Sequence, residues 1–148
     1  MATEYIKNGN FINEFKYWTQ DSEFALRFEP YQKGNCIYVP VGCNILQSIP
    51  DLPGKTMRIE FEVRSDQDVD RAVYVVAVGG VPSEGPPQVS PVPGLATNEW
   101  KKVSTRLYFP ISLLNCFVTA GASVPDVPDG LDRSMWFSNF TLTEEPDA

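Results

Sequence analysis

The segment KTMRIEFEVRS, Lys55 to Ser65, decides the fold. Four apolar and four charged residues alternate along it without interruption: Met57, Ile59, Phe61 and Val63 against Arg58, Glu60, Glu62 and Arg64. A period of two is that of a β-strand with one apolar and one polar face. The apolar face needs a cover, so the segment predicts a second layer of sheet packed against it.

The polar face of this strand admits two interpretations. An antiparallel sheet commonly leaves one face in water, and cross-strand ion pairs would then satisfy the arginines and glutamates. Alternatively, the same side chains line a concave site for a ligand. The alternation alone does not choose between them.

Length and charge exclude several classes of protein. The 148 residues suffice for one domain with a sizeable core, and we expect a single domain over 1–148. Hydrophobic residues make up 43% and charged residues 21%, as in globular rather than disordered chains. The net charge of −7 would repel a phosphate backbone or an anionic membrane surface, and no apolar run is long enough to cross a bilayer. We therefore expect neither nucleic acid as a partner nor membrane insertion.

Histidine and cysteine usage argues against an enzyme. The chain has no histidine, so the commonest general base and metal ligand is missing. Cys36, Cys43 and Cys116 show no C-x-x-C spacing, which argues against a zinc or redox site. We expect buried free thiols, with a bond between Cys36 and Cys43 as the alternative in an oxidising compartment.

The N-terminal segment MATEYIKNGN lacks the basic and apolar regions of a signal peptide. The localisation stays open between the cytoplasm and release by a route without a signal peptide. A piece of a larger protein is a further possibility.

Short extended segments recur along the chain, and no window has the periodicity of an amphipathic helix. We expect about nine strands, near residues 5–6, 23–29, 36–39, 44–49, 56–65, 71–78, 100–109, 113–120 and 135–143. Turn signals at such short intervals predict an all-β sandwich or barrel.

Prolines and the C-terminus set further expectations. Pro30 is expected to end the strand at 23–29. The run Gly79 to Asn98 contains five prolines, which exclude a helix or a central strand, and we expect a long loop there. The acidic tail, 144–148, is expected to be frayed.

Three pieces of sequence carry a family resemblance. The first is Ile6 to Phe11, IKNGNF, followed by Trp18. The second is a short strand that leads through Leu-Pro-Gly-Lys into the alternating strand, over residues 45–61. The third is NEWKKV, residues 98–103, together with the closing strand, residues 135–142. Together they resemble carbohydrate-binding modules of families 4, 9 and 22, in the galactose-binding-like jelly-roll group. The resemblance implies a two-sheet antiparallel jelly-roll β-sandwich and a lectin-like function.

Members of this group often hold a structural calcium through an acidic residue after the opening motif and an Asp in the last strand. The corresponding positions here are Ile12, Ser138 and Asn139. Because calcium prefers carboxylate oxygens, we expect no cofactor, with a structural calcium as the alternative. A second candidate metal set is spaced by three, whereas calcium loops more often use a spacing of two: Asp126, Asp129 and Asp132.

Sugar recognition needs flat aromatic rings that stack on pyranose faces and planar polar groups that bridge hydroxyls. Candidates on the polar face of the sheet come from three strands: Arg58, Glu60, Tyr74, Arg106 and Tyr108. An alternative site lies on loops: Tyr31, Gln32 and Asn35, together with residues 84–88. Glu60 and Glu62 could act as the acids of a glycosidase, but we expect them to pair with Arg58 and Arg64 instead.

The sequence thus predicts a non-catalytic protein that binds carbohydrate on a concave sheet face or through end loops. The alternative is a protein-interaction or structural domain of a larger assembly, such as a phage tail, a toxin or a secreted complex. A carboxylate-based glycosidase is the third possibility.

Overall fold

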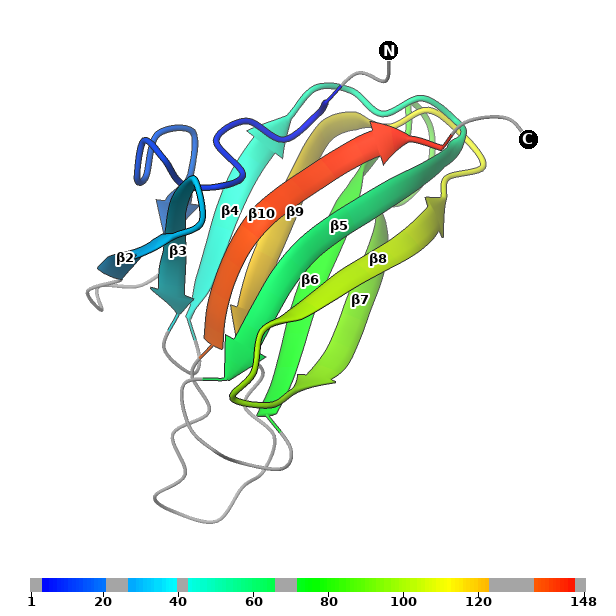
Figure 1. Ribbon diagram of the computed structural model, residues 1–148. Helices are drawn as coiled ribbons and strands as arrows, with labels where there is room; N and C mark the ends of the chain where they lie inside the picture. Colours follow the sequence, from blue (N-terminus) through cyan, green and yellow to red (C-terminus); the bar gives the residue numbers. More distant parts are fainter. Residues whose placement is uncertain (1–3, 21–26, 40–42, 66–71, 123–134, 146–148) are drawn as a thin grey trace.

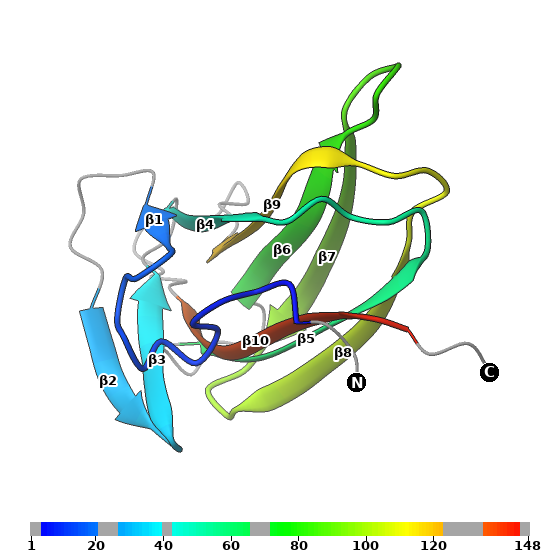
Figure 2. The same ribbon diagram turned by 90° about the horizontal axis from the view of Figure 1, so that it is seen from above.

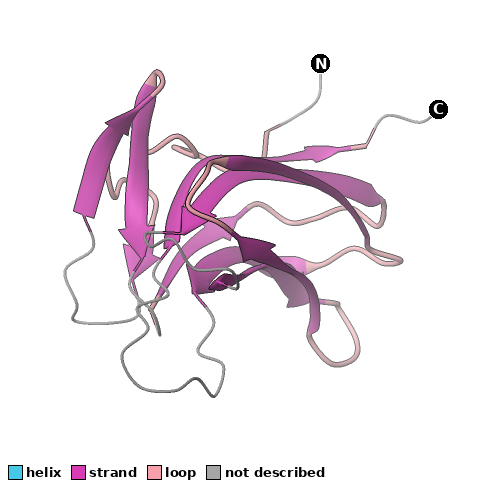
Figure 3. Ribbon diagram, turned by 60° about the horizontal axis from the view of Figure 1, so that its bottom comes forward, coloured by secondary structure: helices cyan, strands magenta, loops and turns pink. Residues whose placement is uncertain are grey.

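The computed structural model describes residues 4–20, 27–39, 43–65, 72–122 and 135–145. This part of the chain forms ten strands and no helix, and hence no helix that could cross a membrane (Figures 1 and 3). The strands are β1 Thr19–Gln20, β2 Arg27–Tyr31, β3 Gly34–Val39, β4 Asn44–Ile49, β5 Thr56–Ser65, β6 Ala72–Val81, β7 Gln88–Ala96, β8 Lys101–Tyr108, β9 Leu114–Ala122 and β10 Met135–Glu144.

Two five-stranded sheets pack face to face (Figure 2). Sheet A has the order β1-β4-β9-β6-β7, and sheet B has the order β2-β3-β10-β5-β8. All paired strands are antiparallel, and from β4 onward the chain crosses repeatedly between the sheets. The predicted all-β, two-sheet antiparallel jelly-roll sandwich is confirmed.

The strand that decides the fold lies inside sheet B, between β10 and β8. Its burial alternates as predicted, and each of its four apolar side chains is at most 1% exposed. Phe61 stacks on Phe140 with ring centroids 5.5 Å apart and meets Tyr74 of sheet A edge-on at 5.7 Å. Because burial of each such side chain stabilises the fold by about 2 kcal/mol, this row fixes which face of β5 points inward.

The proline-rich run that was expected to be a loop contains a strand. β7 pairs with β6 along its whole length, from Ala96 opposite Ala72 to Gln88 opposite Gly80. Pro91 and Pro93 are tolerated because β7 is an edge strand of sheet A, where a missing backbone N–H costs little. The loop prediction is therefore wrong over 79–81 and 88–96. The exclusion of a helix holds, whereas the exclusion of a central strand fails at Gly79–Val81, because β6 lies between β9 and β7.

The first predicted strands also differ from the structure. Pro30 does not end a strand, because β2 is the edge strand of sheet B and continues to Tyr31. Tyr5 and Ile6 form no strand, although the Tyr5 N–H donates to the Leu142 carbonyl at 2.9 Å. Residues 23–26 and 71 of the predicted strands lie outside the described residues.

The C-terminal end of β10 is held by side chains and backbone. The Glu144 carboxylate accepts hydrogen bonds from Tyr5 Oη at 3.0 Å and Lys55 Nζ at 2.7 Å. The Glu145 N–H donates to the Thr56 carbonyl at 3.0 Å. The prediction of a frayed tail over 144–148 is therefore wrong for Glu144 and Glu145. Residues 146–148 lie outside the described part of the chain.

The three cysteines are buried and form no disulfide. Free thiols are confirmed, and the alternative bond between Cys36 and Cys43 is not present. Burial raises the pKa of the Cys36 and Cys116 thiols, so these side chains stay protonated at neutral pH.

Candidate functional site

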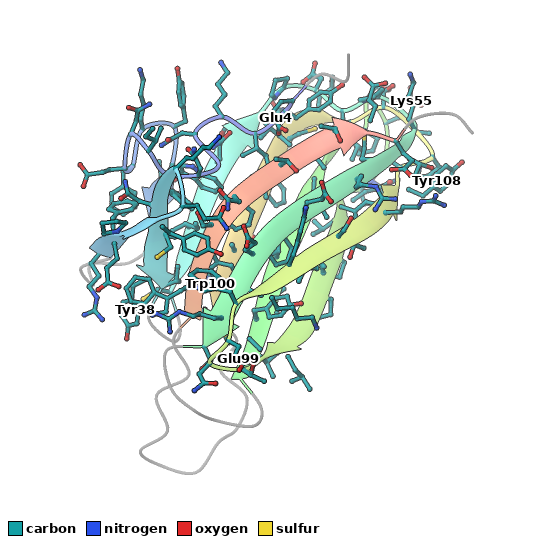
Figure 4. The ribbon with its side chains drawn as sticks, in the orientation of Figure 1. Glu4, Tyr38, Lys55, Glu99, Trp100 and Tyr108 are labelled. Carbon is teal, nitrogen blue, oxygen red and sulfur yellow. The ribbon has the colours of Figure 1, made fainter. Side chains whose placement is uncertain are left out.

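The outer face of sheet B carries most of the predicted site residues. Arg58 and Glu60 of β5 lie opposite Arg106 and Ser104 of β8, and Tyr108 lies opposite Thr56. All these side chains point away from the core, since the alternating residues of β5 are buried. Tyr108 is 69% exposed and lies at the opposite end of the face from Trp100 (Figure 4).

Tyr74 does not belong to this face, and its assignment there is wrong. It lies on β6 of sheet A, is 3% exposed, and points into the core toward Phe61. A Cβ on Gly94 of β7 would collide with the Tyr74 hydroxyl, so the glycine leaves room for the inward ring. Burial raises the pKa of Tyr74. Because β6 is apolar on both faces, its sequence could not indicate which side was inward.

A row of aromatic rings and arginines crosses sheet B near one end. Strand register places Arg27 opposite Tyr38, Tyr38 opposite Trp136, and Trp136 opposite Arg64. Trp100, directly before β8, continues the row beside Arg64. The Arg27 guanidinium lies 4.3 Å from the Tyr38 ring centroid, and the Arg64 guanidinium lies 5.3 Å from that of Trp136 and 5.6 Å from that of Trp100. Cations at these distances from ring faces attract them.

Trp136 is only 2% exposed, although its side chain lies on the outer face of sheet B and is not part of the core that the two sheets enclose. The Tyr38 ring packs against it at 5.1 Å, and two guanidinium groups cover it. The outer face of sheet B thus has a small buried cluster of its own.

A stacked ring pair joins the two edges of this face. Tyr31 of edge strand β2 stacks on Trp100, beside edge strand β8, with centroids 4.2 Å apart and planes at 25°. In a flat sheet of five strands the two edges would be about 19 Å apart. The contact therefore requires the face to be concave, and Tyr31 lies opposite Gly34, which has no side chain to obstruct it.

The Tyr31 hydroxyl donates to the Glu62 carboxylate at 2.7 Å. Burial, followed by this hydrogen bond and the charge of Glu62, raises the pKa of Tyr31 to about 12. The Asn139 amide donates to the Glu62 carboxylate and, at 2.9 Å, to Gln32 Oε1. Glu62 is thus held by two neutral donors, and its expected pairing with an arginine on the same strand is wrong.

A polar hollow of about 280 Å³ opens beside the ring pair. Its walls come from β5, β8, β10 and the turn after β2: Gln32, Glu60, Phe61, Glu62, Lys102, Asn139 and Thr141. Lys102 and Glu60 place opposite charges on neighbouring strands, while the amides add donors and acceptors. The hollow therefore offers several kinds of hydrogen-bonding group within a small volume.

Asn139 lies at an irregularity that shapes the hollow. The register of β10 with β5 shifts between Ser138 and Thr141, and Asn139 has φ 55°. Asn is among the residues that adopt this left-handed conformation most readily. The shift allows Phe137 and Phe140 to point into the same core, and it exposes the Asn139 amide to the outer face.

A second hollow, of about 480 Å³, lies on the other side of this irregularity. It shares Asn139 and Thr141 with the first, and its remaining walls come from Phe140 and the N-terminal loop: Glu4, Ile6, Asn8, Gly9, Asn10, Ile12, Asn13 and Tyr17. Two shared residues make the two hollows adjacent along the face. The exposed Tyr17 ring has the Lys7 and Lys16 ammonium groups 5.1 and 5.4 Å from its centroid.

The opening motif of the sequence holds this N-terminal loop. Asn8 has φ 53°; its amide donates to the Glu14 and Lys16 carbonyls, and its Oδ1 accepts from the Asn13 N–H. The Trp18 Nε1–H donates to the Asn8 carbonyl at 3.0 Å, and Trp18 is buried. The motif that carries the family resemblance therefore folds and anchors the N-terminal loop.

An ion-pair cluster occupies the Tyr108 end of the face. The Glu145 carboxylate accepts from Arg58 at 2.7 and 2.9 Å and from Arg106 Nε at 3.2 Å. The hydrogen bond with Arg58 holds the pKa of Glu145 below its ordinary value and raises that of Arg58. The sequence predicted that Arg58 pairs with Glu60. In the structure Arg58 pairs with Glu145 instead.

The positions that correspond to the family's calcium ligands do not fit that ion. Ile12 is apolar, the Ser138 hydroxyl donates to the Asn35 carbonyl at 2.6 Å, and the Asn139 amide nitrogen is engaged with Glu62. No group of three or more His, Cys, Asp or Glu side chains that could hold a metal occurs among the residues the structure describes. Asp126, Asp129 and Asp132 lie outside those residues.

Sequence reasoning missed several residues of the face: Tyr38, Trp100, Lys102, Trp136 and Thr141. Tyr31 and Gln32, considered only as loop residues, reach the face because β2 extends past Pro30. Asn35 instead donates to the Phe11 carbonyl and anchors the N-terminal loop, and residues 84–88 lie at the β6–β7 connection. Alternation along β8 could have found Lys102, whereas Trp136 required the strand register.

No protein-family model and no curated protein matches the chain. A family 16 carbohydrate-binding module superposes with a TM-score of 0.69 and 16% identity, over 95% of this chain and 99% of that one. A Clostridium thermocellum endo-1,4-β-D-xylanase 10B with CBM22 and GH10 modules, complexed with xylohexaose, gives 0.72 and 14%, over 99% and 29%. The enzymatically active domain of bacteriophage CBA120 tailspike protein 4 gives 0.71 and 12%, over 96% and 21%.

The chain thus spans less than a third of the xylanase and tailspike chains but nearly all of the isolated module. At these identities the likeness concerns the fold. The chain has the jelly-roll sandwich fold of carbohydrate-binding modules.

Proposed function

We propose that the protein is a non-catalytic carbohydrate-binding module whose site is the concave outer face of sheet B. One observation carries the proposal: the stacked Tyr31–Trp100 pair stands beside a hollow lined by a lysine, glutamates and amides. Structures that share the fold include a carbohydrate-binding module and a xylanase complexed with xylohexaose, which supports the same class of ligand.

The two kinds of group serve different parts of a sugar. A partly exposed ring such as Trp100 can stack on the apolar face of a pyranose where the ligand displaces Tyr31 from it. Glu60, Lys102 and the Asn139 amide can bridge hydroxyl groups that point away from the ring face. Because the hollows adjoin at Asn139 and Thr141, an extended chain of sugars fits the face better than a single unit.

Arg58, Arg106 and Tyr108 form the far end of the proposed site. The arginines are preorganised by Glu145, so little side-chain entropy is lost when a ligand contacts them. Tyr108 offers the most exposed ring on the face. We expect it to contribute a terminal stacking position.

Hydrolysis is not part of the proposal. A glycosidase needs two carboxyl groups on either side of the scissile bond, one of them a free acid. Glu60 and Glu62 project from the same strand, and Glu62 already accepts hydrogen bonds from Tyr31 and Asn139. The arrangement is suited to holding a ligand rather than cleaving it.

The test is a glycan array followed by titration calorimetry with the strongest ligand. Lys102→Ala should weaken binding about tenfold, since a charge-assisted hydrogen bond is worth roughly 1.5 kcal/mol. Lys101→Ala is the matched control, because Lys101 is also exposed but does not line the hollow. Equal affinity for both variants, or no bound glycan at all, would contradict the proposal.

A further inference from the structure

The outer face of sheet A is free of charge. None of its strands, β1, β4, β6, β7 or β9, contains Asp, Glu, Lys or Arg, although such residues make up 21% of the chain. The two outer faces point to opposite sides of the sandwich (Figure 2). The charges of the chain are therefore distributed very unequally around the molecule.

Strand register defines what this face presents. Three complete rows run across β7, β6, β9 and β4: Val89, Gly79, Phe117 and Ser48; Pro91, Ala77, Thr119 and Leu46; Pro93, Val75, Gly121 and Asn44. Leu95 and Val73 begin a fourth row. The only polar groups in these rows are hydroxyls and one amide.

The rows also give the face a relief. The outward side chains of β7 are exposed, with Val89 at 51% and Leu95 at 54%, and Pro91 and Pro93 stand between them. On the adjacent strands β6 and β9 the outward positions are buried or only partly exposed: Val73, Val75, Ala77, Gly79, Phe117, Thr119 and Gly121. The most exposed apolar side chains of these three strands therefore stand along β7.

We propose that this face is the interface of a homodimer, with a second copy of the chain as its occupant. A two-fold axis that lies in the plane between the two faces would bring the same surface of both copies together, as an isologous contact requires. Each copy carries a net charge of −7, which disfavours association of two copies in general. The strands of sheet A contain no charged residue that would add to this repulsion at the contact.

The area of the face agrees with this occupant. Three strands of 9 to 10 residues and one of six, spaced 4.8 Å apart, span roughly 550 Å² in projection. The accessible area of a corrugated face exceeds its projection, and stable interfaces bury about 600–1,000 Å² per partner. A second copy stacked over the whole face reaches the lower end of this range.

Sedimentation equilibrium of the full chain tests the interface directly, at protein concentrations from about 1 to 100 µM. The unmodified chain should be dimeric in the upper part of this range. Leu95→Lys should raise the dimer dissociation constant at least about tenfold, because the substitution sets two ammonium groups into one apolar contact. Val89→Lys, in another row, should do the same.

Ile12→Lys is the matched control. Ile12 is an apolar residue with 56% exposure, close to the value of Leu95, but it lies on the N-terminal loop and not on a strand of sheet A. This variant should remain dimeric, and circular dichroism with melting temperature verifies that all variants are folded. A monomer at every concentration, or a dimer that both sheet A variants leave intact, would overturn the proposal. The outcome is independent of glycan binding, which belongs to the opposite face.

Discussion

The outer faces of the two sheets follow the same alternation and differ in what fills the outward positions. In β5 of sheet B these positions hold Arg58, Glu60, Glu62 and Arg64, and in β6 of sheet A they hold Val73, Val75, Ala77 and Gly79. The first face is charged, carries several aromatic side chains and contains a hollow. The second is uncharged and shallow. The fold determines that a face points outward, and the residues at alternate positions determine what it can contact.

The two faces also differ in depth. The sheet B face contains a buried layer of its own, with Trp136 at 2% exposure beneath two arginines. Phe117 on the sheet A face is only partly covered, because its neighbour across β6 is Gly79. This difference predicts unequal sensitivity to truncation.

The largest expected effect compares these two aromatic residues. Trp136→Ala should lower the free energy of unfolding by about 3–5 kcal/mol, because it empties a covered site and removes the ring that Arg27 and Arg64 both contact. Phe117→Ala should cost about 1 kcal/mol, typical of a partly exposed side chain. Urea denaturation measures both. Equal losses would show that the sheet B cluster has no stabilising role.

Asn139 provides a test within the sheet B face. Both Asn139→Gly and Asn139→Ala remove the amide that lines the hollow, so both should weaken glycan binding about tenfold. Only alanine strains the backbone at φ 55°, so Asn139→Ala should be about 1 kcal/mol less stable than Asn139→Gly. Calorimetry and urea denaturation separate the two effects. If the two variants are equally stable, the left-handed conformation is not what selects Asn here.

A smaller effect is expected for Tyr31→Phe, which keeps the stack on Trp100 and removes only the hydroxyl that binds Glu62. We expect a loss of about 1 kcal/mol in the free energy of unfolding. In a spectrophotometric titration of the phenols, the component near pH 12 should disappear, because the pKa of Tyr31 is about 12. Persistence of that component would assign it to another tyrosine.

The smallest effect concerns pH and the Glu145 cluster. Arg58 holds the pKa of folded Glu145 below its ordinary value near 4.5, so this group stabilises the fold above that pH. The contribution is lost as pH falls through the folded pKa. Between pH 6 and pH 3 the melting temperature should therefore fall less for Glu145→Gln than for the unmodified chain. Sheet A strands contain no carboxylate that could produce such a dependence. If the melting temperatures of the two proteins fall in parallel with pH, the Arg58–Glu145 pair does not contribute to stability.

Strands β5 and β8 of sheet B could be predicted from sequence because their residues alternate cleanly. The bounds of β5 agree with expectation, and Arg58, Glu60, Arg106 and Tyr108 lie on one face. Tyr74 could not be placed, because β6 is apolar on both sides and its inward face depends on packing against Phe61.

The positions of Trp136 and Trp100 in one row show a second limit of prediction from sequence. Their proximity follows from the pairing of β10 with β5 and of β5 with β8, and pairing between distant strands is not written in local sequence. The irregularity at Asn139 adds to the difficulty, because strict alternation would place Phe137 and Phe140 on opposite faces. β7 was not predicted because its prolines argue against a strand, and the sequence does not show that β7 lies at a sheet edge, where prolines are tolerated.

The stacked pair of Tyr31 and Trp100 has a consequence for selectivity. A pyranose that approaches the indole meets a phenol already seated there. Its arrival would be an exchange, in which one ring contact worth about 0.5–1.5 kcal/mol replaces another of similar strength. Stacking would then largely cancel from the net affinity, and discrimination among sugars would be left to the hydroxyl patterns that the neighbouring lysine, amide and carboxylates can match.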